Sequence, residues 1–218
     1  MPEILPGVHL VDGVDEGTHV YLLKDRGTTW TLLDTGLPGA STAILAYLAK
    51  LKVEPTSVKK VLVTHLHRDH TGSLKEILEK TRARSFSHWI EAAFIAGDPP
   101  YDGPGMPPAE PVQIDETLKD GDSVDAAGGL IAYHTPGHTP GHTSFYQTER
   151  KLLFSGDLFF VDDGKLILTT PEYTIHTPTA KISARRLGRL SVDSLLTYHG
   201  GPILKNGGGA LRKLVETL

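Results

Sequence analysis

The sequence predicts an α/β protein in which mixed β-sheets are covered by helices. In the first half, runs rich in β-branched and aromatic residues alternate with helical patterns, which is typical of an α/β arrangement. In the second half, strand-forming runs are separated by the turn sequences "GG", "TER" and "DDG", which predict three successive hairpins. Together the two patterns favour mixed sheets with helices packed against them.

Each expected element has its own local pattern. Apolar residues at Ile44, Leu48 and Leu51 fall at helical spacing, and Gly39 marks the start of that helix. From the N-terminus, the expected elements are a hairpin of Val20–Lys24 and Thr28–Asp34, the helix after Gly39, a strand in "VKKVLVTH", a helix in "GSLKEILEKT", the three hairpins, a helix over Thr177–Leu190, a strand in "SLLTYHGG" and a closing helix in "ALRKLVETL".

The composition fits a globular protein, and we expect a single domain over residues 1–218. With 22 Lys and Arg against 26 Asp and Glu, the formal charge is -4. The basic cluster at Ala184–Arg189 would be scattered around a solvated helix face, so we expect no nucleic-acid partner. No apolar run approaches the ~20 residues needed to cross a bilayer. Residues 1–13 lack the pattern of a secretory signal, so we expect a cytoplasmic protein without membrane contact.

Two further features of the composition narrow the chemistry. The chain has no cysteine, which excludes disulfides, thiolate metal sites and a cysteine nucleophile, so any metal site must use nitrogen and oxygen. Asn206 is the only asparagine, and Gln113 and Gln147 are the only glutamines. Proteins from hot environments avoid these thermolabile residue types, so we hypothesise that this protein is thermostable.

A proline-rich segment interrupts the pattern of elements. Six of the 15 prolines lie between Asp98 and Pro111, which rules out regular structure there. An interdomain linker and an ordered loop, with Tyr101 and Met106 near a pocket or an interface, both fit this composition.

The stretch "VTHLHRDHTG", which follows an expected buried strand, carries four polar side chains: His65, His67, Asp69 and His70. Sites of open α/β sheets lie beyond the strand ends. Because unpaired buried polar groups are costly, this cluster needs a partner, and a divalent cation suits neutral imidazole and carboxylate. A capped loop with ordinary surface histidines would account for one such residue but not for four.

The spacing within this stretch divides the side chains into two pairs. His65 and His67 are two residues apart on an extended segment, so they can bind one ion together. Asp69 and His70 point elsewhere and would serve a second ion.

The motif resembles that of the metallo-β-lactamase superfamily, and later segments match that family in order. "HTPGHTPGHTS" is similar to its second metal segment, "FSGDLFF" to its third and "TYHGG" to its last. The resemblance covers essentially the whole chain, and these segments look like those of the thioester and lactone hydrolases, such as hydroxyacylglutathione hydrolases. It implies a four-layer αβ/βα sandwich of two mixed β-sheets flanked by helices.

The resemblance also implies a set of metal ligands, carried over position by position. The first ion would be bound by His65, His67 and His138, the second by Asp69, His70 and His199, and the two would be bridged by Asp157. A carboxylate suits the bridge because its oxygens can span two cations ~3.5–4 Å apart. Zinc is the expected metal, and iron or manganese would accept the same ligands.

Two more polar residues are expected to support the ligands. His138 lies in the middle of a loop, whereas His142 begins the next strand, so we assign the metal to His138 and a structural role to His142. Asp34 either orients a ligand histidine through its other ring nitrogen or caps a turn before Gly36.

These residues predict a metal-dependent hydrolase. Two bound cations lower the pKa of a shared water and hold hydroxide as the nucleophile. Asp69, as the catalytic residue, can orient this hydroxide or move a proton to the leaving group. We expect cleavage of an ester-type bond, such as a thioester or lactone, in a small-molecule substrate, by a chain that could form a homodimer. Candidates for the pocket wall, or otherwise for the core, are Phe159, Phe160 and Tyr173.

Two alternatives from other reaction classes stay open. Persulfide dioxygenases of this superfamily share the His and Asp segments but use one iron, so the retention of Asp69, His70 and His199 favours the hydrolase. A phosphodiesterase or nuclease of the superfamily also fits the core motif, although the acidic charge argues against it.

Overall fold

The computed structural model describes residues 3–11, 14 and 17–218. Residues 1–2 and 12–13, which belong to the segment where we expect no secretory signal, lie outside the described residues. Within the described ranges, no helix is long and apolar enough to span a membrane.

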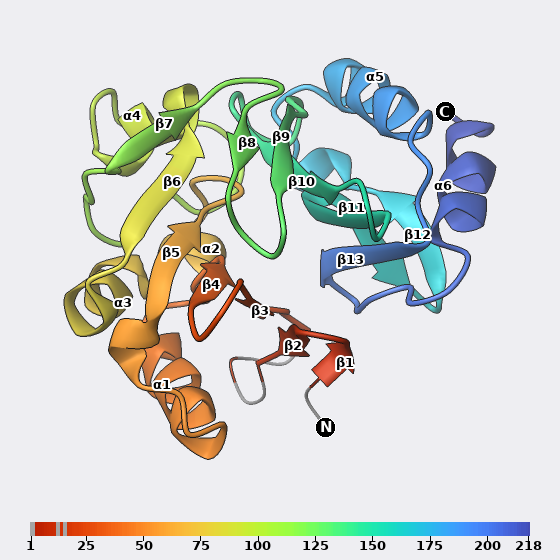
Figure 1. The fold of residues 1–218 in the computed structure, drawn as a ribbon. Coiled ribbons are helices and arrows are strands. Elements are labelled where there is room, and N and C mark those ends of the chain that lie inside the picture. The colour runs from red at the N-terminus through yellow and green to blue at the C-terminus, as the bar shows by residue number, and fades with distance from the viewer. Residues whose placement is uncertain (1–2, 12–13, 15–16) are drawn as a thin grey trace.

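Two β-sheets form the centre of the fold (Figure 1). Among the described residues, the first sheet has seven strands in sequence order: β1 (Glu3–Leu5), β2 (Val8–Leu10), β3 (Tyr21–Lys24), β4 (Trp30–Leu33), β5 (Val58–Leu62), β6 (Arg84–His88) and β7 (Glu116–Leu118). The second sheet has the order β12-β11-β10-β9-β8, with β13 paired to β11. Its strands are β8 (Ser123–Val124), β9 (Leu130–His134), β10 (Thr143–Gln147), β11 (Leu152–Asp162), β12 (Lys165–Leu168) and β13 (Ser194–His199).

Helices cover the outer faces of both sheets. The helices are α1 (Ala40–Lys50), α2 (Arg68–Thr71), α3 (Leu74–Thr81), α4 (Trp89–Ile95), α5 (Thr177–Leu187) and α6 (Gly207–Val215), with short 3₁₀ turns η1 (Pro55–Ser57) and η2 (Pro171–Tyr173). Figure 1 shows α1, α3 and α4 on one flank of the molecule and α5 and α6 on the other.

The alternation of side chains along each strand divides the core into three layers. Leu22 of β3 and Val61 of β5 pack with α1 and α3, whereas their neighbours Tyr21 and Leu62 face the second sheet. On the far side of the second sheet, Leu153 of β11 packs with α5 and α6. The predicted four-layer αβ/βα sandwich is therefore confirmed.

Most of the expected elements are present, with shifts at their ends. β3 pairs with β4, β8 with β9, β10 with β11 and β11 with β12, all antiparallel, as the hairpin patterns predict. The predicted strand in "VKKVLVTH" ends at Leu62, and the closing helix begins at Gly207, three residues before the predicted start. The local patterns do not predict β1, β2, β6, β7 or α4, because such short elements depend on their neighbours in the fold.

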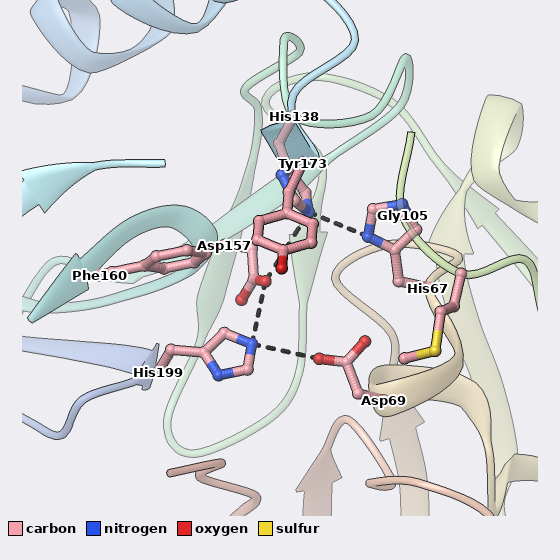
Figure 2. Close-up of a pocket in the computed structure, with 9 residues that line it drawn as sticks. His67, Asp69, Gly105, His138, Asp157, Phe160, Tyr173 and His199 are labelled. Atoms are coloured by element: carbon pink, nitrogen blue, oxygen red, sulfur yellow. Dashed lines mark hydrogen bonds and ion pairs between the residues drawn. The ribbon is translucent and has the colours of Figure 1, made fainter. Parts of the chain in front are cut away.

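The connectivity brings chain segments from both sheets to one edge. Strands β4 to β7 are parallel, so their C-terminal ends lie on the same side of the first sheet. The chain leaves β5 at this edge through residues 63–70. In the second sheet, β11 carries Asp157 and β13 ends at His199, and both reach the same edge (Figure 2).

The layer between the sheets provides a test of the packing. Phe154 is 1% exposed there, and its ring lies 5.7 Å from that of Tyr21 in an edge-to-face contact. Phe154→Ala should lower the free energy of unfolding by about 3–5 kcal/mol, because it removes apolar contacts and leaves a cavity. Urea unfolding measures this, with Ile182→Ala as the control because Ile182 is 65% exposed. Equal losses in the two variants would contradict this account of the core.

Candidate metal centre

A pocket of about 410 Å³ lies at the edge where the two sheets meet (Figure 2). Its volume is within the ~300–1,000 Å³ usual for small-molecule sites. The lining residues are His67, Asp69, Gly105, Met106, His138, Asp157, Phe160, Tyr173 and His199. They come from separate segments, so the fold rather than any one stretch builds the pocket.

Three histidines form the first group of converging side chains. Nε2 of His65, Nδ1 of His67 and Nε2 of His138 lie 3.1 Å from one another. Burial lowers the pKa of all three rings, so they are neutral at physiological pH. Neutral imidazole is the form that binds a metal ion.

The other ring nitrogen of each of these histidines has a partner outside the group. Nε2 of His67 lies 3.0 Å from the carbonyl oxygen of Pro104. Because a carbonyl only accepts, the ring proton is on Nε2, and Nδ1 presents its lone pair to the group. The other two outer contacts, each of 3.1 Å, are from His138 Nδ1 to Thr169 Oγ1 and from His65 Nδ1 to Thr64 Oγ1.

Two carboxylates and two histidines form the second group: Asp69, His70, Asp157 and His199. Nε2 of His199 lies 3.1 Å from Asp69 Oδ2 and 3.2 Å from Asp157 Oδ2. Nε2 of His70 lies 3.4 Å from Asp69 Oδ2 and 3.3 Å from Asp157 Oδ1. Asp157 Oδ2 is also 3.7 Å from His138 Nε2. The structure thus brings all seven residues together in the two expected sets, with Asp157 between them.

The side chains of the second group fit a divalent cation. His70 Nε2 and Asp157 Oδ1 are buried and have no hydrogen-bond partner among the described residues, and they lie 3.3 Å apart as an ion pair. Buried polar atoms in this state are costly unless a further group satisfies them. Imidazole nitrogen and carboxylate oxygen without sulfur are ligands that suit zinc, iron and manganese.

The charges of the second group also prepare it for a cation. Burial by itself would lower the pKa of His199, but the carboxylate of Asp157 outweighs this and raises it to about 10. Burial by itself would raise the pKa of Asp69, but the charge of His70 and a hydrogen bond from His199 hold it below its usual range. Protons on the histidines therefore balance the two carboxylates without a metal, and metal binding would displace them.

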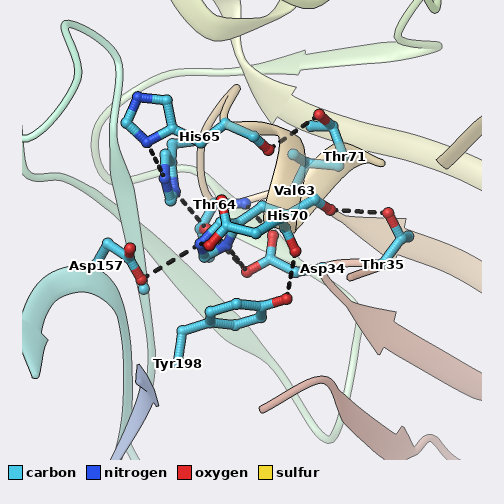
Figure 3. A network of polar contacts seen from close by, with 12 residues as sticks. Asp34, Thr35, Val63, Thr64, His65, His70, Thr71, Asp157 and Tyr198 are labelled. Atoms are coloured by element: carbon cyan, nitrogen blue, oxygen red, sulfur yellow. Dashed lines mark hydrogen bonds and ion pairs between the residues drawn. The ribbon is translucent and has the colours of Figure 1, made fainter. Parts of the chain in front are cut away.

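Asp34 contacts His70, a member of the second group (Figure 3). Its carboxylate accepts hydrogen bonds from His70 Nδ1 at 2.9 Å and from the amide and hydroxyl of Thr64 at 2.8 Å each. The proton of His70 is thereby held on Nδ1, and Nε2 faces Asp69 and Asp157. Of the two interpretations of Asp34, orientation of a histidine is the one that the contacts support.

His142 has the structural role expected from its place before β10. Its Nε2 accepts a hydrogen bond from the backbone amide of Asp157 at 3.0 Å, and its Nδ1 lies 2.9 Å from Thr135 Oγ1. Burial lowers the pKa of His142 to about 3, so the ring stays neutral and can accept that bond. His142 thus fixes the backbone that carries Asp157.

The proline-rich segment 98–111 is an ordered loop against the pocket rather than a linker. The hydroxyl of Tyr101 donates to the carbonyl oxygen of Pro104 at 2.7 Å, the same oxygen that His67 contacts. A Cβ atom on Gly105 would lie 2.3 Å from His67 Nε2, so this close approach requires glycine.

The pocket candidates divide between wall and core. Phe160 and Tyr173 line the pocket (Figure 2). Met106 from the proline-rich loop also belongs to the lining. For Phe159 the core is the correct alternative and the pocket wall is wrong, because its side chain is 0% exposed and packs between the second sheet and α5 and α6. Adjacent residues of a strand face opposite sides, so Phe159 and Phe160 could not both line the same cavity.

Two supporting residues have no signal in the sequence. Glu91 of α4 accepts hydrogen bonds from Leu66 and from the loop after His138. The hydroxyl of Tyr198 donates to the backbone oxygen of Asp69, and its ring lies 3.7 Å from that of His70. A lone glutamate in "HWIEAAF" or a tyrosine in a strand becomes informative only when its contacts are known.

The comparison with protein families gives a clear result. A model of the metallo-β-lactamase superfamily matches residues 13–199. The chain belongs to the metallo-β-lactamase superfamily. The resemblance seen in the sequence is therefore confirmed, and the protein is a hydrolase of this superfamily.

Relatives within the superfamily are similar over different lengths. A probable metallo-hydrolase of Bacillus subtilis, YflN, is 27% identical over 99% of this chain and 92% of its own length. A hydroxyacylglutathione hydrolase of Synechococcus is 32% identical over 72% of this chain, which matches only 55% of that hydrolase. Among solved structures, a motif mutant of a metallo-β-lactamase from Cronobacter sakazakii has a TM-score of 0.75 and 26% identity, covering 90% of this chain and 79% of its own.

The burial of Glu91 predicts a specific pH dependence of stability. Burial raises the pKa of Glu91 from 4.5 to about 7, although three hydrogen bonds act against this shift. The folded state therefore holds the proton more tightly, so this contribution to stability is fully present below the ordinary pKa and is lost as the pH rises through about 7. In urea unfolding of metal-free protein, the stability of the wild type relative to Glu91→Gln should fall from about pH 5 to about pH 8. A difference that is constant with pH would contradict the shift.

Proposed function

We propose that this hydrolase binds two divalent metal ions, zinc in the first place, and cleaves an ester-type bond of a small molecule, such as a thioester or lactone. The observation that carries the proposal is the convergence of two groups of ligand-type side chains around Asp157 in one pocket. The partial similarity to hydroxyacylglutathione hydrolases supports the ester-type bond.

The residues of the pocket have separate tasks in this proposal. The first ion would be held by His65, His67 and His138, the second by Asp69, His70 and His199, and both by Asp157. When bound, such ions polarise the carbonyl of the substrate and lower the pKa of a water molecule. Asp69 lines the pocket and is kept ionised by its neighbours, so it can accept a proton and return it to the leaving group.

The residues of the pocket wall favour an uncharged, partly apolar substrate. Met106, Phe160 and Tyr173 form its apolar side, and Asp69 and Asp157 are its acidic residues. No lysine or arginine is among the lining residues that the structure describes, so an anionic substrate would find neither of these side chains as a partner in this pocket. A neutral ester or lactone suits such a wall better than a charged peptide thioester.

The one-iron dioxygenase and the nuclease are less well supported. An enzyme with one iron has no use for a complete second group, and here Asp69 and His199 approach within 3.1 Å. A nuclease needs cations of its own around the phosphates of its substrate, which this pocket lining does not offer.

Metal content tests the ligand assignment. Fully loaded protein should contain close to two zinc ions per chain by elemental analysis, one for each group. His138→Ala should lose metal and activity, whereas His142→Ala should keep its metal and mainly lose stability, because His142 bonds to backbone rather than to the converging atoms. Loss of metal in His142→Ala with full content in His138→Ala would invert the assignment.

The reaction class is tested by metal exchange. Protein stripped of metal and reloaded with zinc under argon should hydrolyse a thioester or an aliphatic lactone, because hydrolysis needs a Lewis acid and no redox couple. Asp69→Ala should lower kcat by ~10²–10⁴-fold, the usual contribution of a positioned proton-transfer group. If the zinc-loaded protein hydrolyses neither substrate and the iron-loaded protein consumes oxygen with a persulfide, the dioxygenase is favoured.

A further inference from the structure

Glu91 is a fully buried carboxylate that joins the two loops carrying the three histidines of the first group. Its exposure is 0%, and it belongs to the first turn of α4. It is none of the seven converging residues and does not line the pocket. A buried carboxylate outside the reactive groups is costly to keep, so its contacts point to a task.

The carboxylate accepts three hydrogen bonds from two segments far apart in the sequence. Oε2 accepts from the backbone amide of Leu66 at 2.7 Å. Oε1 accepts from the hydroxyl of Thr139 at 2.9 Å and from the backbone amide of Gly141 at 2.6 Å. Among the described residues, no lysine or arginine is paired with Glu91, so its hydrogen-bond partners are these three donors.

The donors sit directly beside the histidines. Leu66 lies between His65 and His67, and Thr139 follows His138. One carboxylate therefore fixes the distance between the loop after β5 and the loop after β9, at the two places from which the three rings project. A shift of either loop would move the rings relative to one another.

The packing around this contact leaves no room for a side chain at position 141. A Cβ atom on Gly141 would lie 2.9 Å from the amide nitrogen of Glu91 and 2.8 Å from His88 Nδ1, so only glycine brings its backbone this close to α4. All three groups that contact the carboxylate are donors, so a glutamine would turn at least one N–H toward another donor or leave one donor unpaired.

We propose that Glu91 is a positioning residue that holds His65, His67 and His138 in the geometry that binds a metal ion. The inference rests on the proposed function only in that these three histidines are ligands, and it does not depend on which bond the enzyme cleaves. Partners of ligands typically change metal affinity by ~10–100-fold when they are removed.

The test measures zinc affinity as well as activity. Wild type, Glu91→Gln and the control Glu76→Gln are compared by competition with a chromophoric zinc chelator at about pH 8, above the pKa of Glu91. Glu76 suits the control because it also accepts a hydrogen bond, but from Ser41 rather than from the loops that carry the histidines. We expect the tightest zinc site of Glu91→Gln to weaken at least about tenfold, and Glu76→Gln to match the wild type.

Thermal unfolding of the metal-free variants separates positioning from a purely structural role. If Glu91→Gln melts earlier but binds zinc as tightly as the wild type, the proposal is wrong. If zinc affinity falls while no ester, thioester or lactone is hydrolysed even by the wild type, the proposed function is wrong and the role of Glu91 stands.

A second pair of variants decides the case if Glu91→Gln does not fold. Thr139→Val removes one donor and keeps the shape, and Thr139→Ser keeps the donor. Weaker zinc binding in Thr139→Val than in Thr139→Ser supports the proposal, and equal binding in the two overturns it.

Discussion

The constraint on which this structure depends is the desolvation of seven polar side chains that converge at one edge of the sandwich. Five of them are buried and two are half-buried, and two of their atoms have no hydrogen-bond partner in the part of the chain that the structure describes. Such a cluster is unfavourable in a protein interior unless a cation compensates it. The free energy needed to hold it must come from the apolar layers on either side of the two sheets, which is why a large, well-packed core surrounds a small polar site.

Around this cluster, non-ligand contacts determine which atom each ring presents. The carbonyl oxygen of Pro104 accepts a hydrogen bond from the outer N–H of His67, and the carboxylate of Asp34 accepts one from His70. Because an imidazole has two nitrogens, occupying one of them with an acceptor aims the lone pair of the other at the centre. Glu91 and His142 act one step further out, on the backbone that carries the histidines and Asp157. The site is thus held by contacts between loops rather than by any single element.

Comparison of sequence and structure shows where local patterns suffice. The hairpins and the long helices follow from apolar periodicity and turn residues, which act over a few positions. Strands β6 and β7 and helix α4 have no such pattern, and they form because a neighbouring strand or face is available. Phe159 illustrates the limit: the sequence marks it as large and apolar, but the direction of its side chain depends on the register of β11.

By itself the sequence determined the fold class and the identity of the converging residues. His65, His67, Asp69 and His70 can be recognised because their spacing is local and follows a strand, and the family resemblance adds the distant members of the set. Only the tertiary structure decided the roles of Asp34, Glu91, Tyr101 and Tyr198. Most of their decisive contacts join segments tens of residues apart, and single residues of common types leave no periodic or spaced pattern from which such a contact could be predicted. A side chain that can bind a metal is recognised in the sequence by its chemical type. The residue that orients this side chain is recognised only by its neighbours in space.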